Sequence, residues 1–307
     1  MRRFLALVLA LVMICSLSAT AFAADDTDYQ VTYSNEYDYI VMLQNSTPEK
    51  LAELGMTPAD VTATVDAFYE ALAQRATLPD ETLIGYGYTP NEIKILRSYN
   101  PFSRTTANTD LKKTEDLRAI TGTLTGRIKL TNCGTKYATF RYEWSWDHSP
   151  IMTLKDSAAM RWLAYDTNGY ELDLIKTSET VNIDYYWNAT YKFSRTGSQE
   201  PNLEFNSINV QFEEAELFQS PTTMTEQAYA KCGTIKVSLK VDDSVSNQIN
   251  YIKVAALYGH TIIGANFPSI SLSPTGSISI SFSGNLSINK IGGHKVKIGK
   301  GSTIEDI

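Results

Sequence analysis

After residue 118, apolar and polar side chains alternate along the chain, a pattern typical of β-strands. Between residues 138 and 147 the apolar positions are Ala, Phe, Tyr, Trp and Trp, and the polar positions are Thr, Arg, Glu, Ser and Asp. Because successive side chains of a strand point to opposite faces of a sheet, this segment is predicted to bury one aromatic face. The segment 120–130 is its predicted hairpin partner, with Cys133 at the turn.

Further strands of the same texture are predicted along the rest of the chain. The pair Asn168-Gly169 lies between two of them and is typical of a tight hairpin turn. The predicted ranges are 159–166, 170–175, 181–193, 206–212, 234–241, 251–258 and 277–282. Strands do not alternate with helices in this region, so the pattern favours an antiparallel β-sandwich over 118–307 rather than a parallel α/β fold.

Residues 24–99 show helical spacing instead. The motif GMTPADV at 55–61 returns as GYTPNEI at 87–93, and each copy begins a segment with apolar residues three and four positions apart. Thr57 and Thr89 are predicted N-caps, Pro fits the first helical turn, and an acidic residue three positions after each Thr completes a capping box. We therefore predict a small helical unit and an α+β fold class. The alternative reason for the repeat is a peptide- or wall-binding module.

Two segments that flank the helical unit are predicted to lie outside the folded domains. Residues 1–23 contain two arginines, an apolar run and a final Ala-Phe-Ala, the pattern of a secretory signal peptide. No later segment is apolar for long enough to cross a membrane, so we expect a secreted protein, extracellular or associated with the cell wall. Residues 100–117 are polar, lack sustained periodicity and are predicted to be a linker.

The charge of the chain argues against one class of partner. The 34 acidic residues outnumber the 27 basic ones, and the net charge is −7. Such a chain lacks the positive surface that nucleic-acid phosphates require. Basic residues gather only in 289–301, which includes Lys295, Lys297 and Lys300. These lysines are candidates for contact with anionic wall polymers, and the alternative is that they protect an edge strand from pairing.

Two cysteines, Cys133 and Cys232, follow the predicted signal peptide. Export to an oxidising environment makes a disulfide between them a candidate. The alternative is two separate thiols, because spacing in the sequence does not establish proximity in the fold.

Two acidic runs are candidates for a calcium site. Glu213 and Glu214 belong to the run Glu-Glu-Ala-Glu, and Asp242 and Asp243 are adjacent. Carboxylate oxygens are the ligands that Ca²⁺ prefers. The alternative is that these are solvated charges at strand ends.

Aromatic side chains suggest a surface for a glycan. Those of the predicted strand 181–193 fall mostly on one face, which is expected to be core because large rings bury the most apolar area. Tyr186 points away from that face and is the ring expected to meet solvent, where it would stack on a sugar.

A hydrolytic site is the alternative to a binding function. Asp147, His148 and Ser149 have the residue types of a catalytic triad, but adjacent residues do not converge in space as a triad requires, and no G-x-S-x-G motif is present. A secreted hydrolase of this sequence would instead use His148 or His260 with a carboxylate from elsewhere in the chain.

Several motifs together resemble a group of secreted proteins of Gram-positive bacteria. They are GYTPNEIKILRSY, YEWSWDHSP, MRWLAY and ALYGH. Members of this group look like a signal peptide, a short helical region and a β domain with a W-x-W strand that ends near Pro. The resemblance implies the same domain order and a bacterial source, and it implies no catalytic residues.

These observations favour a secreted, non-enzymatic protein that binds at the cell surface. The expected partners are a cell-wall polymer, a glycan or a surface protein, with calcium as the one candidate cofactor. The alternatives are a secreted hydrolase with its site on the sandwich loops and a self-associating matrix component.

Overall fold

The structure is a computed structural model. It describes residues 27–54, 56–98, 111–199, 206–219, 225–261, 270–272, 280–282, 286–297 and 304–306. Only the backbone is described for 27–32, 53, 98, 111–113, 199 and every residue after 261. The predicted signal peptide, 1–23, and Lys300 lie outside the described residues.

Six helices form in the first part of the described chain. They are α2 (Glu36–Gln44), α3 (Pro48–Glu53), α4 (Pro58–Arg75), α5 (Asp80–Gly85), α6 (Pro90–Ser98) and α7 (Leu111–Ile120). The capping boxes form as predicted: the backbone N–H of Thr57 donates to Asp60 at 2.7 Å, and that of Thr89 donates to Glu92 at 2.7 Å. Gly87 has φ +95°, the left-handed conformation expected between α5 and α6.

Helix α7 occupies residues 111–117, which the polar composition had placed in a linker. Its apolar contacts come from Leu117 and Ile120, which are both buried in the core of the helical unit. Two buried side chains three positions apart are too few for a sustained period in the sequence, yet they hold one face of a short helix. Residues 99–110 lie outside the described residues.

The strands form two seven-stranded sheets and one short hairpin, with antiparallel pairing throughout the described ladders. Sheet A contains β1 (Thr27–Asn35), β2 (Thr123–Gly134), β3 (Tyr137–Trp146), β6 (Leu174–Trp187), β7 (Thr190–Arg195), β10 (Ala215–Gln219) and β11 (Thr225–Val241). Sheet B contains β4 (Lys155–Tyr165), β5 (Glu171–Leu172), β8 (Ser198–Gln199), β9 (Ser207–Glu213), β12 (Tyr251–Thr261), β15 (Leu286–Lys297) and β16 (Ile304–Asp306). The hairpin pairs β13 (Ile270–Leu272) with β14 (Ile280–Phe282).

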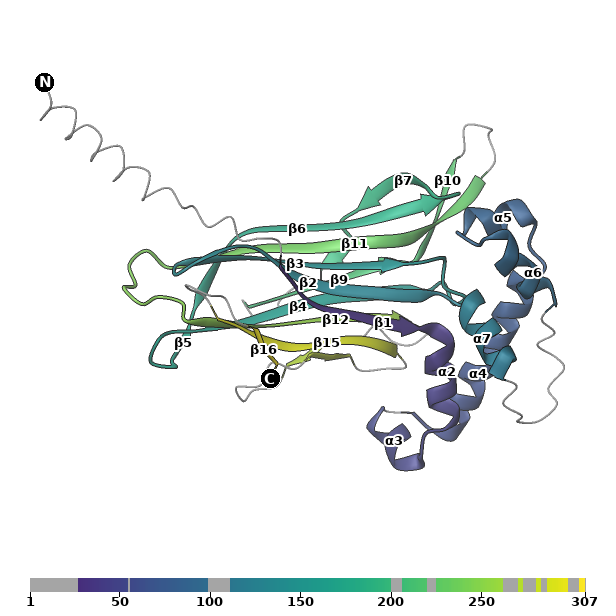
Figure 1. The fold of residues 1–307 in the computed structure, drawn as a ribbon, viewed down its shortest axis with the longest axis horizontal. Helices are drawn as coiled ribbons and strands as arrows, with labels where there is room; N and C mark the ends of the chain where they lie inside the picture. The colour runs from purple at the N-terminus through teal and green to yellow at the C-terminus, as the bar shows by residue number, and fades with distance from the viewer. Residues whose placement is uncertain are drawn as a thin grey trace, which may run out of the picture.

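In both sheets, strands that are neighbours in space are often far apart in the sequence. Sheet A runs β1-β2-β3-β11-β6-β7, with β10 beside β11, and sheet B runs β16-β15-β12-β4-β9-β8, with β5 beside β4. Figure 1 shows long strands along the main axis of the molecule and the helices gathered at one end of them. The fold is therefore mixed α and β with a β-rich body.

The aromatic stripe predicted for 138–147 is confirmed. Its five apolar side chains are at most 3% exposed: Ala138, Phe140, Tyr142, Trp144 and Trp146. They belong to one apolar cluster with side chains of sheet B, among them Trp162 and Tyr258. The bulky rings thus lie between side chains contributed by both sheets.

Two hairpin turns show which local signals the sequence carries. Gly169 has φ +83° in the turn after β4, as the Asn-Gly pair predicted. The single strand predicted over 181–193 is wrong, because the chain reverses between β6 and β7 at Asn188 and Ala189, whose φ angles are 53° and 54°. Positive φ at both central residues is typical of a tight hairpin turn, and Ala is uncommon there, so the sequence concealed it.

The candidate disulfide does not form, and Cys133 and Cys232 are two separate free thiols, which was the alternative. Cys133 lies opposite Ala138 and Cys232 lies opposite Ser145, both on β3. Seven positions along a strand correspond to roughly 23 Å, whereas the Cα atoms of a disulfide lie within about 7 Å.

The helical unit is built onto the sheets. Strand β1 pairs with β2 inside sheet A and leads directly into α2. The core of the helices also includes Ile151 and Tyr229 from the β body. Arg75, at the end of α4, is buried and donates to the carbonyl oxygen of Pro150 at 2.7 Å. The helices and sheets therefore meet in a packed junction.

Candidate functional site

A cavity of about 240 Å³ opens at this junction, and we call it the junction cavity. Strand β1 and helix α2 supply one side, while β2, β3 and β12 supply the other. The lining residues are Tyr33, Ser34, Asn35, Glu36, Asp38, Tyr39, Met42, Leu124, Trp146, Tyr258 and His260.

Asn35 creates the cavity by turning the chain from β1 into α2. Its side-chain oxygen accepts from the N–H of Tyr37 at 3.0 Å, which caps the helix. Its amide donates to the Thr121 carbonyl and the Thr123 hydroxyl, each at 3.0 Å. Because β1 ends at the residue that caps α2, the side chains just before and just after Asn35 line the same cavity.

The wall of the junction cavity is aromatic and partly open to solvent. Tyr33 is 71% exposed and Met42 is 37% exposed, while burial raises the pKa of Tyr39 to about 12. Deeper in, the indole N–H of Trp146 donates to the hydroxyl of Tyr258 at 3.2 Å. The wall offers flat apolar faces that a ring-shaped ligand would cover.

The floor of the cavity is a buried cluster of one imidazole and three carboxyl groups, which we call the acid–histidine cluster. Nε2 of His260 lies 3.3 Å from Oε1 of Glu36, and Nδ1 lies 3.2 Å from Oδ1 of Asp156 and 3.5 Å from Oε1 of Glu214. All four residues are at most 2% exposed. Only Glu36 and His260 line the cavity itself.

The carboxyl groups differ in their other partners. Glu36 accepts from the backbone N–H groups of Ile151 and Met152 at 2.8 and 2.9 Å. Asp156 accepts from the N–H of Thr261 at 3.0 Å and from the Tyr258 hydroxyl. Among the described residues, neither carboxyl oxygen of Glu214 has a hydrogen-bond partner.

Charges and burial inside the acid–histidine cluster shift the pKa values of His260 and Glu214 away from their ordinary values. Burial acts to lower the pKa of His260, but the negative charges of Glu214 and Asp156 and the hydrogen bonds that the imidazole donates to Asp156 and Glu36 together raise it well above its ordinary value. Burial raises the pKa of Glu214 well above its ordinary value, and the nearby Asp156 raises it further. Burial and the neighbouring carboxyl groups therefore disfavour additional uncompensated negative charge in this cluster.

Glu214 is buried because of where the chain changes sheets. Strand β9 belongs to sheet B and β10 to sheet A, and Glu214 is the one residue between them. Its N–H donates to the Leu154 carbonyl at 2.8 Å, and its carbonyl accepts from the N–H of Ala230 at 2.7 Å. Both sheets thus hold the backbone here and direct the side chain inward.

The four acidic residues of the expected calcium site are not brought together. Glu213 pairs with Lys155 at 3.0 Å, on the side away from the buried Glu214. Asp242 and Asp243 lie in the turn after β11, roughly 40 Å along that strand from the position beside Glu214. The group whose atoms could hold a metal ion is instead Asp156, Glu214 and His260, with one ligand atom of each within 4.8 Å of the others.

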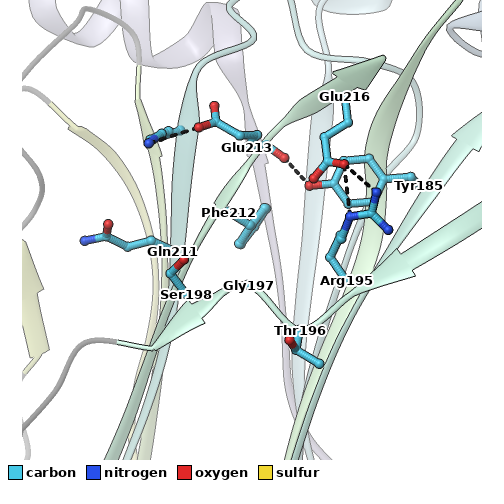
Figure 2. A pocket seen from close by; sticks show the side chains of 10 residues that line it. Tyr185, Arg195, Thr196, Gly197, Ser198, Gln211, Phe212, Glu213 and Glu216 are labelled. Carbon is cyan, nitrogen blue, oxygen red and sulfur yellow. Dashed lines mark hydrogen bonds and ion pairs between the residues drawn. The ribbon is translucent and has the colours of Figure 1, made fainter. Parts of the chain in front are cut away.

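A second cavity, of about 300 Å³, lies between the ends of β7, β8, β9 and β10, and we call it the edge cavity (Figure 2). Figure 2 shows Arg195 directed at Glu216, which it meets at 3.0 Å, and Tyr185 directed at the carbonyl oxygen of Glu213, to which its hydroxyl donates. Each charged side chain drawn there has an opposite charge beside it.

The remaining candidate residues lie elsewhere. Tyr186 is half-buried, with its ring edge-on to Tyr191 at 6.0 Å, and Tyr191 is the more exposed at 50%. Lys295 lies opposite Lys253 and Glu305, and Lys297 lies opposite Tyr251. Since β16 covers the strand at Lys295, this lysine does not protect a sheet edge.

His148 belongs to the structural junction. It is 3% exposed, its ring stacks on Tyr88 at 4.6 Å, and its Nε2 lies 3.2 Å from the carbonyl oxygen of Ala119. The hydroxyl of Ser149 lies 3.4 Å from the Pro150 carbonyl instead of facing the histidine. These contacts do not form a triad.

Comparison with known proteins identifies no family for this chain. No family model matches, and no curated protein matches. One solved structure, described as AvmM catalysing macrocyclization in alchivemycin A biosynthesis, is 13% identical, covers 55% of this chain and 84% of its own, and has a TM-score of 0.24. Clostridium perfringens delta-toxin is 9% identical, covers 57% and 85%, and has a TM-score of 0.20. Likenesses this weak carry no functional inference.

The described helices place one limit on membrane association. None of them combines the length and the apolar character needed to span a bilayer.

Proposed function

We propose that the protein is a secreted, non-enzymatic binding protein of the cell surface and that its ligand is a neutral glycan end held in the junction cavity. The observation that carries this proposal is the exposed ring of Tyr33 in a cavity whose lining also includes the carboxyl groups of Glu36 and Asp38. Sugar rings stack their C–H faces on aromatic side chains, and their hydroxyl groups donate to carboxylates.

The charge of the lining favours a neutral ligand over an anionic one. Among the described residues that line the cavity, Glu36 and Asp38 are acidic and none is Lys or Arg. Asp38 is held by Arg118 at 2.6 Å, so its carboxylate is fixed as an acceptor. An anionic wall polymer would meet like charge here, whereas sugar hydroxyl groups would find acceptors.

The fold class that accompanies this proposal is a β-sandwich with a helical unit at one end. It is supported by the apolar cluster to which both seven-stranded sheets contribute. Such a body would act as a rigid support, with binding confined to the end where the helices and strands meet.

A secreted hydrolase is the second candidate, favoured by the presence of two carboxylates in one aromatic cavity. Its weakness is the way these groups are engaged. Glu36 accepts from two backbone N–H groups and Asp38 accepts from Arg118, so each is engaged as a hydrogen-bond acceptor, while a glycosidase requires one carboxyl group that donates a proton.

Pull-down of the protein on purified cell wall, soluble glycans and whole cells tests the proposal. The variant Tyr33→Ala is expected to lose about five- to thirtyfold in affinity, because one stacked ring contributes on the order of 1–2 kcal/mol. Tyr170→Ala is the matched control, since Tyr170 has the same 71% exposure and lines neither described cavity. Equal binding by both variants, or turnover of a glycoside or ester by the unmodified protein, would contradict the proposal.

A further inference from the structure

We propose that Asp156, Glu214 and Nδ1 of His260 form a buried site for one divalent transition-metal ion, with Zn²⁺ as the best fit. The site adjoins the junction cavity, which His260 lines and Asp156 and Glu214 do not, and the metal proposal does not depend on a glycan being bound there. Three elements supply the ligands: β4, the crossover between β9 and β10, and β12.

The spacing of the three groups fits a single coordination shell. Bonds of about 2.0–2.2 Å from a tetrahedral zinc ion to nitrogen and oxygen place neighbouring ligand atoms roughly 3.3 Å apart. Nδ1 of His260 lies 3.2 Å from Oδ1 of Asp156 and 3.5 Å from Oε1 of Glu214. These two separations match the edge length of such a tetrahedron, and all three ligand atoms lie within 4.8 Å of one another.

Glu214 provides the observation that points to an ion. Its side chain is 0% exposed, it is directed at Nδ1 of His260, and neither of its oxygens has a hydrogen-bond partner among the described residues. A buried carboxylate requires a compensating charge or a metal ion. A divalent cation would compensate Glu214 and Asp156 together, so the site with its ion would be neutral.

The groups around the ligands have the arrangement of a metal site's outer shell. Glu36 faces the other ring nitrogen of His260 at 3.3 Å, so with an ion bound at Nδ1 the N–H at Nε2 would donate to Glu36. Backbone N–H groups of Ile151 and Met152 fix Glu36, while Thr261 and Tyr258 fix Asp156. The orientations of His260 and Asp156 are therefore set before an ion arrives.

The donor set selects among ions. Calcium takes six to eight oxygen ligands, whereas this site offers two carboxyl groups and a nitrogen. Imidazole nitrogen with carboxylate oxygen suits zinc and its neighbours in the first transition row. Three protein ligands leave one tetrahedral position for a water molecule, and the complete burial of the carboxyl groups indicates a structural ion.

The test is the metal content and thermal stability of the full chain. After chelation and dialysis, Zn²⁺, Mn²⁺ and Ca²⁺ are added separately, and bound metal is measured by elemental analysis. We expect about one equivalent of Zn²⁺ and a rise in Tm of about 5–10 °C, less with Mn²⁺ and none with Ca²⁺. Less than one tenth of an equivalent of any ion, with no change in Tm, would overturn the proposal.

The variant Glu214→Gln separates a metal site from a protonated acid. Glutamine mimics a protonated glutamic acid, so in a protein that binds no metal this change would leave Tm equal or higher. At a metal site it removes a ligand, and we expect at least tenfold weaker Zn²⁺ binding and loss of the zinc-dependent rise in Tm. Glu213→Gln is the matched control, because Glu213 is the next residue along the chain and its carboxylate is half exposed and paired with Lys155.

Discussion

The junction cavity and the edge cavity are similar in size, about 240 and 300 Å³, but they satisfy their charges differently. In the edge cavity Arg195 meets Glu216 and Lys155 meets Glu213, so each charge has its own partner. At the floor of the junction cavity one imidazole serves three carboxyl groups. The two cavities thus differ in the number of buried carboxyl groups for each cation and hardly differ in volume. This excess of carboxyl groups is the reason for proposing a ligand or a metal ion at the junction.

The largest expected effect comes from removing the one basic group of the acid–histidine cluster. His260→Gln leaves three buried carboxyl groups without a cation or a ligand nitrogen, and the free energy of unfolding is expected to fall by roughly 3–5 kcal/mol. Denaturant unfolding of the full chain measures this loss.

His148→Gln is the control for that change, because His148 is equally buried but faces a carbonyl oxygen and an exposed aspartate. Its expected cost is about 1–2 kcal/mol. If His148→Gln and His260→Gln lower the free energy of unfolding equally, the three carboxyl groups around His260 do not make that histidine more important for stability than another buried histidine.

An intermediate effect is expected from the hydroxyl that supports Asp156. Tyr258→Phe removes the donor to Asp156 and the acceptor for the Trp146 indole, and we expect a loss of about 1–3 kcal/mol in unfolding free energy. Tyr229→Phe is the matched change: Tyr229 is also buried, and its hydroxyl has no hydrogen-bond partner among the described residues. We expect that variant to be neutral or slightly more stable, and the reverse order would refute this account.

The smallest effect is expected in the edge cavity. Arg195→Met keeps an apolar stem of similar length but removes the ion pair with Glu216 and the guanidinium group that lies 4.3 Å from the centre of the Phe193 ring. Because the arginine is about half exposed, the loss is expected to be no more than about 1 kcal/mol and to shrink further in high salt. A loss above 2 kcal/mol would show that this cavity depends on its charges as much as the junction does.

Local patterns in the sequence predicted the parts of the fold that local forces determine. Alternation placed the buried rings of β3, and Thr-Pro followed by an acid placed the starts of α4 and α6. The turn at Asn188-Ala189 was missed because both residues have positive φ angles, yet neither is the glycine that usually occurs in such a turn. The disulfide was mispredicted because the register of β2, β3 and β11 is set by long-range pairing.

The candidate site was only partly visible in the sequence, for a similar reason. Glu36 and His260 are 224 positions apart, and Asp156 and His260 are 104 apart. Each acidic residue resembles a solvated charge until the fold surrounds it. Glu214 was considered for calcium and His260 for a hydrolase with an unnamed carboxylate, and no periodicity links the two. Glu36 and Asp156 were missed altogether, although an acid directly after the helix cap Asn35 is a local signal in retrospect.

The same separation of 224 positions has a consequence for how the protein reaches its final form. The contact between α2 and β12 closes a loop that includes most of the chain. Such contacts form late, because closing a long loop costs conformational entropy before the contact can stabilise the fold. Helix α2 can find its final place only after β12 has been made, so the N-terminal helices would remain loosely organised during most of synthesis and would settle in one of the last folding steps.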